Sequence, residues 1–234
     1  MTISVRMNLA VAEQLLVRFH NAREQHLQVI QESRDTGARR LEATAHANLA
    51  AVLCELGEFQ SGYDTALEAL RILRVAGDRT VEAEAHHSAQ TAAHALGRWA
   101  QALSHARAAR AGYAAAGHRS GAWTSAGMSV RCLQLLGEPA QALAEADALL
   151  AEVHEGGGWS GCYDGANNLY HALTAMGDAR AGAVLAAAHQ GLVLEADRIA
   201  AYVPRDEYMR SQIVTREICE AWAAAQTSGS ATPA

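Results

Sequence analysis

Apolar residues recur along much of the chain with the spacing of an α-helix. Residues 41–56 carry apolar side chains three or four positions apart, which places them on one helical stripe, at Ala45, Leu49, Val52, Leu53 and Leu56. Residues 59–76 repeat this pattern with Ala66, Ala69, Leu70 and Leu73. Because only a short polar segment separates the two stretches, the pattern predicts two antiparallel helices joined by a tight turn.

A 40-residue repeat organises most of the chain. A leucine or methionine followed by glycine recurs with this step at Leu56-Gly57, Leu96-Gly97, Leu136-Gly137 and Met176-Gly177. A second glycine series lies between them with the same step, at Gly37, Gly77, Gly117 and Gly157. Glycine adopts the left-handed conformation that ends helices. The two series together predict a repeated unit of helix, turn, helix and turn.

Small residues also keep a fixed position in each second helix. The first position holds Gly62, Ala102, Ala142 and Gly182, and the second holds Ala66, Ala106, Ala146 and Ala186. Small side chains allow two helix backbones to approach closely. We therefore expect thinly packed antiparallel hairpins.

The composition supports an all-α fold and excludes several classes of function. The 234 residues include 53 alanines but only three prolines, which favours helix. The 19 basic residues are all arginine and are outnumbered by 25 acidic residues, for a net charge of −6, which argues against direct nucleic-acid binding. The lack of lysine excludes a Walker-type phosphate loop and Schiff-base chemistry.

Nothing in the sequence indicates a membrane protein or a disulfide-bonded one. No uncharged run reaches the roughly 18 residues that a membrane helix needs, and Glu13 interrupts the apolar N-terminal stretch. The cysteines are widely spread, at positions Cys54, Cys132, Cys162 and Cys219. We expect buried thiols in a reduced, cytoplasmic protein.

The turn motifs resemble those of the tetratricopeptide repeat (TPR) family. LGEF (56–59) is followed by Gly62, Ala66 and Ala69, LGRW (96–99) is followed by the equivalent alanines, and LGEPAQAL (136–143) and MGDARAGA (176–183) are weaker copies. The period is 40 rather than the usual 34 or so, glycine replaces the closing proline, and alanine replaces the large aromatic of the second helix. Such longer helices resemble those of bacterial regulatory ATPases, transcriptional activators and scaffold proteins.

The resemblance implies an all-α solenoid of antiparallel helix hairpins wound as a right-handed superhelix. We expect degenerate capping helices in residues 1–38 and four repeats in residues 39–202. A closing helix is expected in residues 203–226, and a disordered tail in residues 227–234. First helices of such repeats line a concave surface that carries partner peptides.

Carrying the family's groove-facing positions onto this chain gives a polar candidate groove. Its residues are Asn48, Glu84, His87, Thr91, His94, Arg131, Gln134, Asp164, Asn167, Asn168 and His171. A cluster arranged around Gly127 suits a carboxylate or phosphate, and it consists of Arg131, His87, His94, Asn167 and His171. Alternatively, Arg131 pairs with Asp164 or Glu84, and these acidic residues equally suit a ligand that carries arginine or an amine.

Other site chemistries are less well supported by the residues. His86, His87 and His94 share one helix but lack evident further metal ligands, so we expect no metal and no cofactor. Asp164 and His171 resemble the orienting half of a catalytic pair, yet no serine or cysteine is placed as nucleophile. Cys162 is the thiol expected to be most exposed.

The irregular segment GGGWSGCYDGANN (156–168) breaks the rhythm of the repeat. Trp159 and Tyr163 could form an aromatic lip over the groove together with Trp123, or pack between neighbouring hairpins, which is the expectation we favour. The glycine run follows a helix and contains no lysine, so its context excludes a nucleotide-binding loop.

Three functional hypotheses follow. The first is a non-enzymatic module that binds a peptide or protein segment in the groove, without nucleic acid or membrane and with homodimer formation left open. The second is a ligand-sensing regulatory module that works beside a transcription or signalling protein. The third and weakest is an enzyme that uses Asp164, His171 and Arg131 for acid–base chemistry.

Overall fold

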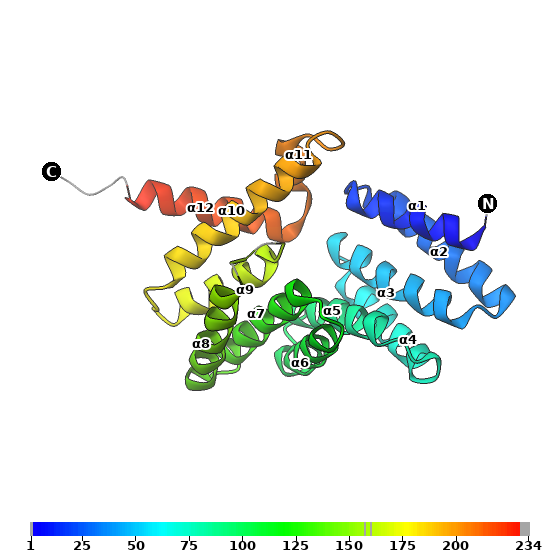
Figure 1. Ribbon diagram of the computed structural model, residues 1–234, viewed down its shortest axis with the longest axis horizontal. Helices are drawn as coiled ribbons and strands as arrows, with labels where there is room; N and C mark the ends of the chain where they lie inside the picture. Colours follow the sequence, from blue (N-terminus) through cyan, green and yellow to red (C-terminus); the bar gives the residue numbers. More distant parts are fainter. Residues whose placement is uncertain (1, 157, 160, 230–234) are drawn as a thin grey trace. The chain divides into compact units, whose positions relative to one another are not determined.

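The computed structural model describes residues 2–156, 158–159 and 161–229 (Figure 1). Within these residues every regular element is a helix, so the all-α prediction is confirmed. The chain divides into two compact units, residues 1–125 and 126–234. Helix α7 (Arg119–Leu135) contributes to both units. Each unit is described by itself.

The first unit contains six complete helices in antiparallel pairs. They are α1 (Ile3–Leu15), α2 (Phe19–Thr36), α3 (Arg39–Glu55), α4 (Phe59–Ala76), α5 (Arg79–Ala95) and α6 (Trp99–Ala115). Each helix packs against the next, and α3 also packs against α5. First helices therefore stand beside first helices, as in a stack of hairpins.

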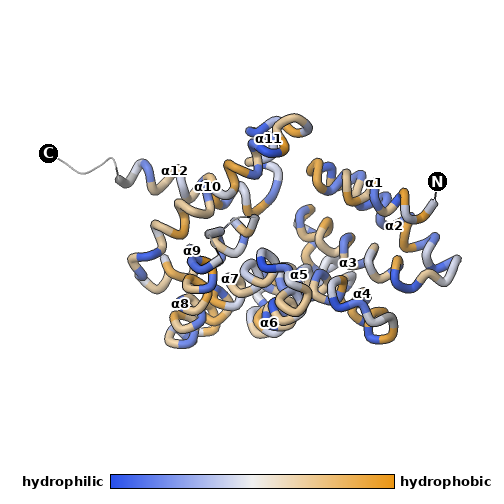
Figure 2. Tube along the Cα trace, in the orientation of Figure 1, coloured by the Kyte–Doolittle hydropathy of each residue, from blue (hydrophilic) through white to orange (hydrophobic). Residues whose placement is uncertain are grey.

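Its core follows the apolar stripes expected from the sequence. Ala45, Leu49 and Leu53 of α3 are buried in a cluster with Met7 and Val29. A second cluster joins α3, α4 and α5 through buried residues such as Ala43, Ala47, Ile72, Leu73 and Val81. Figure 2 shows hydrophobic and hydrophilic residues mixed along α3, as expected for a helix buried on part of its surface.

The second unit contains the rest of α7 and five further helices. They are α8 (Pro139–Glu155), α9 (Tyr163–Ala175), α10 (Ala181–Ile199), α11 (Arg205–Ser211) and α12 (Ile213–Gly229). Helix α12 packs against α9, α10 and α11. Residues 203–226, expected as one closing helix, thus contain α11 and most of α12. Of the expected tail, residues 227–229 belong to α12 and residues 230–234 lie outside the described part of the chain.

The glycine positions explain the repeat. The described glycines of both series have positive φ values of 69–78° and stand directly after or just past a helix end, at Gly37, Gly57, Gly77, Gly97, Gly117, Gly137 and Gly177. This is the left-handed conformation that only glycine adopts without strain. Gly157 lies outside the described residues. Helix starts keep the 40-residue step from Arg39 through Arg79 to Arg119.

The small positions of the second helices behave as expected in three pairs. Ala102 and Ala142 are fully buried, and so are the alanines at the second position of the first three pairs, Ala66, Ala106 and Ala146. A Cβ built on Gly62 would lie 3.2 Å from the Ala50 carbonyl oxygen, so α3 and α4 approach closely there. The last pair differs, because Gly182 is exposed.

Candidate functional site

Helix α9 places Asn167 and His171 one turn apart, and both face Glu217 of α12. The Asn167 Nδ2 donates a hydrogen bond to Glu217 Oε2 at 2.9 Å. The His171 Nε2 lies 3.6 Å from the same oxygen, an ion-pair distance when the imidazole is protonated. Helix α12 is held in place by its own buried residues, Thr215 and Ile218.

Arg131 of α7 belongs to the same cluster. The His171 and Asn167 contacts and the positive charge of Arg131 lower the pKa of Glu217 against the opposing effect of burial. Burial lowers the pKa of the Arg131 guanidinium, and the Glu217 carboxylate opposes this effect. Three of the predicted groove residues therefore converge on a carboxylate of the chain itself. We call Arg131, Asn167, His171 and Glu217 the α9 cluster.

The α9 cluster changes the interpretation of the predicted anion site. The carboxylate that we expected from a ligand, or from Asp164 or Glu84, is supplied in part by Glu217. Gly127 also has a different role from the one expected. A Cβ built on Gly127 would lie 2.2 Å from the Gly165 carbonyl oxygen, so its missing side chain makes room for the α9 backbone rather than for a ligand.

Asn167 and Asp164 each keep a buried oxygen without a hydrogen-bond partner. Asn167 is only 2% exposed, and its Oδ1 has no partner among the described residues. The same holds for the Oδ1 of Asp164, one turn earlier on α9. Burial and then the charge of Glu217 raise the pKa of Asp164 to about 6. Helix α9 thus presents unsatisfied acceptors beside the cluster.

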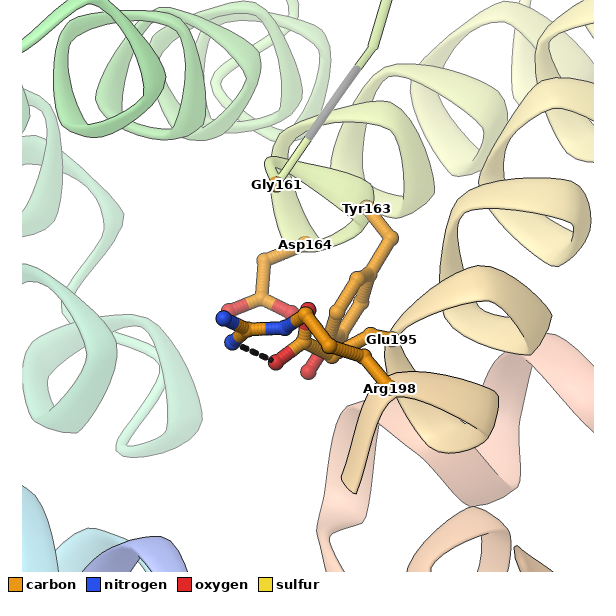
Figure 3. Close-up of a pocket in the computed structure, with 5 residues that line it drawn as sticks. All are labelled: Gly161, Tyr163, Asp164, Glu195 and Arg198. Atoms are coloured by element: carbon orange, nitrogen blue, oxygen red, sulfur yellow. Dashed lines mark hydrogen bonds and ion pairs between the residues drawn. The ribbon is translucent and has the colours of Figure 1, made fainter. Parts of the chain in front are cut away.

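Asp164 also lines a pocket between the start of α9 and the end of α10 (Figure 3). Its volume is about 230 Å³, and it is lined by Gly161, Tyr163, Asp164, Glu195 and Arg198. The Tyr163 hydroxyl is hydrogen-bonded to that of Tyr208 in α11 at 3.0 Å. The Asp164 carboxyl and the side chains from α10 point into the same space in Figure 3.

The candidate residues on α5 belong to the first unit. The Nδ1 of His87 is 2.9 Å from the Gln90 Nε2, and its ring meets Tyr113 edge-on at 6.3 Å. Burial lowers the pKa of His87 to about 4. Burial and then Asp78 raise the pKa of Glu84, while His118 opposes them. Thr91 donates to the carbonyl oxygen of His87 in its own helix at 3.1 Å.

Two of the remaining candidate residues have described contacts, and for the other two we report the degree of burial. The Asn48 Nδ2 is 3.9 Å from the Met7 sulfur, so Asn48 faces α1. The Asn168 Nδ2 donates to the Asp164 carbonyl oxygen at 3.1 Å within α9. His94 and Gln134 are half-buried. The structure therefore groups the candidates within each unit, on α5 in the first and around α9 in the second.

The structure also describes the surroundings of three other features that the sequence singled out. Cys162 was expected to be the most exposed thiol, but it is 2% exposed, and burial raises the pKa of its thiol to about 12. Cys219 is the more exposed cysteine, and it is half-buried. Trp123 and Trp159 are buried, in agreement with packing rather than an exposed aromatic lip. His86 contacts His105 of α6, with 2.9 Å between their Nδ1 atoms. Across the described side chains, no group of three or more His, Cys, Asp or Glu could hold a metal ion.

Comparison with solved structures identifies the fold. The chain is similar to the putative kinesin light chain TPR-like repeats of Podosopora anserina, with 17% identity and a TM-score of 0.61 over 82% of this chain and 95% of that one. A variant of those repeats, solved separately, gives 16% identity and a TM-score of 0.62 with the same coverage. This is a TPR-like helical repeat fold.

A Rap protein complexed with Competence and Sporulation Factor is also similar to this TPR-like chain. The identity is 14% and the TM-score 0.64 over 93% of this chain, which spans 65% of the length of the Rap chain. No protein-family model matches the sequence, and no curated protein matches it either. The TPR-like fold is thus confirmed, whereas the likeness to bacterial regulatory ATPases and transcriptional activators stays a prediction. None of the described helices is long and apolar enough to cross a membrane.

Proposed function

We propose that this chain is a protein-interaction module that binds a peptide or protein segment against α9, with the α9 cluster at the centre of the contact. The observation that carries the proposal is Asn167, which is 2% exposed and leaves its Oδ1 without a partner while its Nδ2 holds Glu217. A buried amide oxygen without a hydrogen bond costs free energy. An N–H group of a bound segment would remove that cost.

The fold supports a binding role. Stacked hairpins present extended surfaces, which suit segments of other chains better than small substrates. The Rap protein of similar fold was solved with Competence and Sporulation Factor bound to it. Glu217, as a carboxylate within the α9 cluster, occupies a position that an acidic group of a ligand would otherwise take. A ligand must therefore either bind beside the Glu217 carboxylate or replace it in the α9 cluster.

The experiment selects peptides from a random displayed library on the full chain and measures their affinities by calorimetry. Asn167→Ala and His171→Ala should weaken a selected peptide by about tenfold or more, because each removes a polar contact from a partly desolvated site. His154→Ala is the matched control, because His154 is an exposed histidine at the end of α8. Equal affinities for the wild type, both variants and the control would contradict the proposal that the peptide binds against α9.

The regulatory role and the cytoplasmic location stay predictions, and so does the weaker enzymatic hypothesis. For the last, the described contact of His171 is to Glu217, whereas the hypothesis needs Asp164 as its partner. Homodimer formation likewise stays open as a prediction.

A further inference from the structure

The pocket between α9 and α10 contains a carboxylate that is desolvated and incompletely paired. The Oδ1 of Asp164 is buried and has no hydrogen-bond partner among the described residues. Burial raises the pKa of this carboxyl to about 6, with a further contribution from Glu217, so it is still mostly ionised at neutral pH. A desolvated, ionised oxygen without a donor is costly, and a positively charged donor relieves that cost most effectively.

The same pocket already holds one guanidinium, which shows the chemistry that it accommodates. Arg198 binds Glu195 through two hydrogen bonds, with its Nε 3.0 Å from Oε2 and its Nη2 2.5 Å from Oε1 (Figure 3). The side chain of Arg198 is 73% exposed, so this pair contributes little stability and can rearrange. Arg198 therefore neutralises Glu195 and leaves Asp164 for another cation.

The charges around α9 leave an excess of carboxylate. Near Glu217 the positive charge comes from His171, when its ring is protonated, and from Arg131. Among the described residues that line the pocket, the two carboxylates of Asp164 and Glu195 stand with the single guanidinium of Arg198. The Tyr163 ring also lines the pocket, and its hydroxyl is fixed by Tyr208. An aromatic face next to a carboxylate is a favourable environment for a cation.

We propose that this pocket binds a positively charged group of the ligand, a guanidinium or a primary ammonium, which donates hydrogen bonds to Asp164 beside the ring of Tyr163. The inference rests on the proposed function in taking the group from a peptide or protein segment. It deepens that function, because it makes a basic residue the feature of the partner that is recognised at the start of α9.

The test uses a small probe that does not depend on any peptide. The ¹⁵N-labelled full chain is titrated with N-acetyl-arginine methylamide, and its neutral analogue N-acetyl-citrulline methylamide serves as the control. We expect amide shifts of Gly161, Tyr163 and Asp164 and of the end of α10 with the arginine probe, and much smaller ones with citrulline. A single charge-assisted contact of this kind gives an affinity on the order of millimolar.

Two variants should change the affinity in opposite directions. Asp164→Asn should weaken the arginine probe by about tenfold or more, because the carboxylate is lost. Arg198→Ala should strengthen it by about two- to fivefold, because the competing guanidinium leaves Glu195. A general loss of structure cannot increase affinity, so Arg198→Ala decides the matter if the spectrum of Asp164→Asn shows unfolding.

Equal shifts with both probes, shifts confined to other parts of the chain, or unchanged binding by both variants would overturn the proposal. The outcome is separable from that of the proposed function. If the chain binds the arginine probe at Asp164 but selects no peptide, the cation-binding pocket is supported and the peptide-binding function is contradicted. If the chain binds peptides through the α9 cluster but does not bind the arginine probe, the peptide-binding function is supported and the cation-binding pocket is contradicted.

Discussion

Glu42 is the buried acidic residue on which two arginines of the first unit converge. It is 1% exposed, and its two oxygens accept from Arg34 at 2.8 Å and from Arg39 at 2.6 Å. Glu42→Gln keeps the size but removes the charge, and it should lower the free energy of unfolding by about 1–2 kcal/mol. Both arginines are about half exposed and can be rehydrated, so a larger loss is not expected.

The repeat supplies the control for this change. Glu82 holds the same position one repeat later, but it is exposed. Glu82→Gln should change the free energy of unfolding by less than about 0.5 kcal/mol in the same urea titration. Equal effects of the two substitutions would show that the buried ion pairs of Glu42 add nothing to the free energy of unfolding.

At this scale the sequence predicted part of the candidate site. The repeat positions placed Arg131 with His87, His94, Asn167 and His171, because residues at equal helical positions share a face. Of these, the described contacts and charges connect Arg131, Asn167 and His171 to Glu217. They could not indicate Glu217, which lies in the closing segment outside the repeat. Nor could they show that Asn48 faces α1, because the degenerate leading helices carry no clear repeat position.

Between helices, the backbones of α7 and α9 approach each other closely at Gly127 and Gly165. A Cβ on Gly127 would lie 2.2 Å from a carbonyl oxygen that no side-chain rotation can move. Gly127→Ala should therefore force the two helices apart and cost about 1–3 kcal/mol of stability. It should also displace Asn167 from Glu217, which the chemical shifts of the Asn167 side-chain amide would report.

Gly191→Ala is the matched control, in the interior of α10. A Cβ there would make only ordinary contacts of 3.7 Å, and alanine favours helix. This substitution should raise the free energy of unfolding by about 0.5–1 kcal/mol and so raise the melting temperature slightly. If Gly127→Ala behaves like Gly191→Ala, the close packing of α7 on α9 is wrong.

The helices themselves were largely predictable, and the exceptions have physical reasons. Helix starts follow the glycine stops as far as α8 because each turn reuses the same left-handed residue. In residues 156–162 extra glycines replace helix-forming residues, so α9 begins only at Tyr163. Pro204 separates α10 from α11, but nothing in the pattern of apolar residues marks the break between α11 and α12.

For the molecule as a whole, the distribution of its perturbed groups predicts that acid affects the two units differently. Burial lowers the pKa values of His26, His87 and His105 to about 4, with His86 adding to the effect at His105, and all three residues lie in the first unit. The second unit contains Asp164, whose pKa is raised to about 6, and His189, whose pKa is lowered by burial and then by Arg205. The first unit also contains Glu84, whose pKa burial raises. Histidines that are uncharged in the folded state take up protons more readily when unfolded.

The sign of the effect follows from proton uptake. Between pH 6.5 and about 4 the unfolded state binds more protons at these histidines than the folded state does, so the stability of the first unit falls as the pH falls. Asp164 has the opposite effect, because its folded pKa of about 6 exceeds the ordinary 3.8, so protonation favours the folded second unit. Hydrogen exchange corrected for intrinsic rates should therefore show that acid lowers protection mainly in residues 1–125.

His26 allows this prediction to be tested at one position. It is fully buried, and neither ring nitrogen has a partner among the described residues. With its pKa moving from 6.5 to about 4 on folding, His26 accounts for a loss of about 2 kcal/mol between neutral pH and pH 5. His26→Leu should remove that share, so the difference in protection of α2 and α3 between pH 7.5 and pH 5 should shrink. An acid response of the same size in the variant would mean that His26 is not the buried, uncharged group that the structure shows.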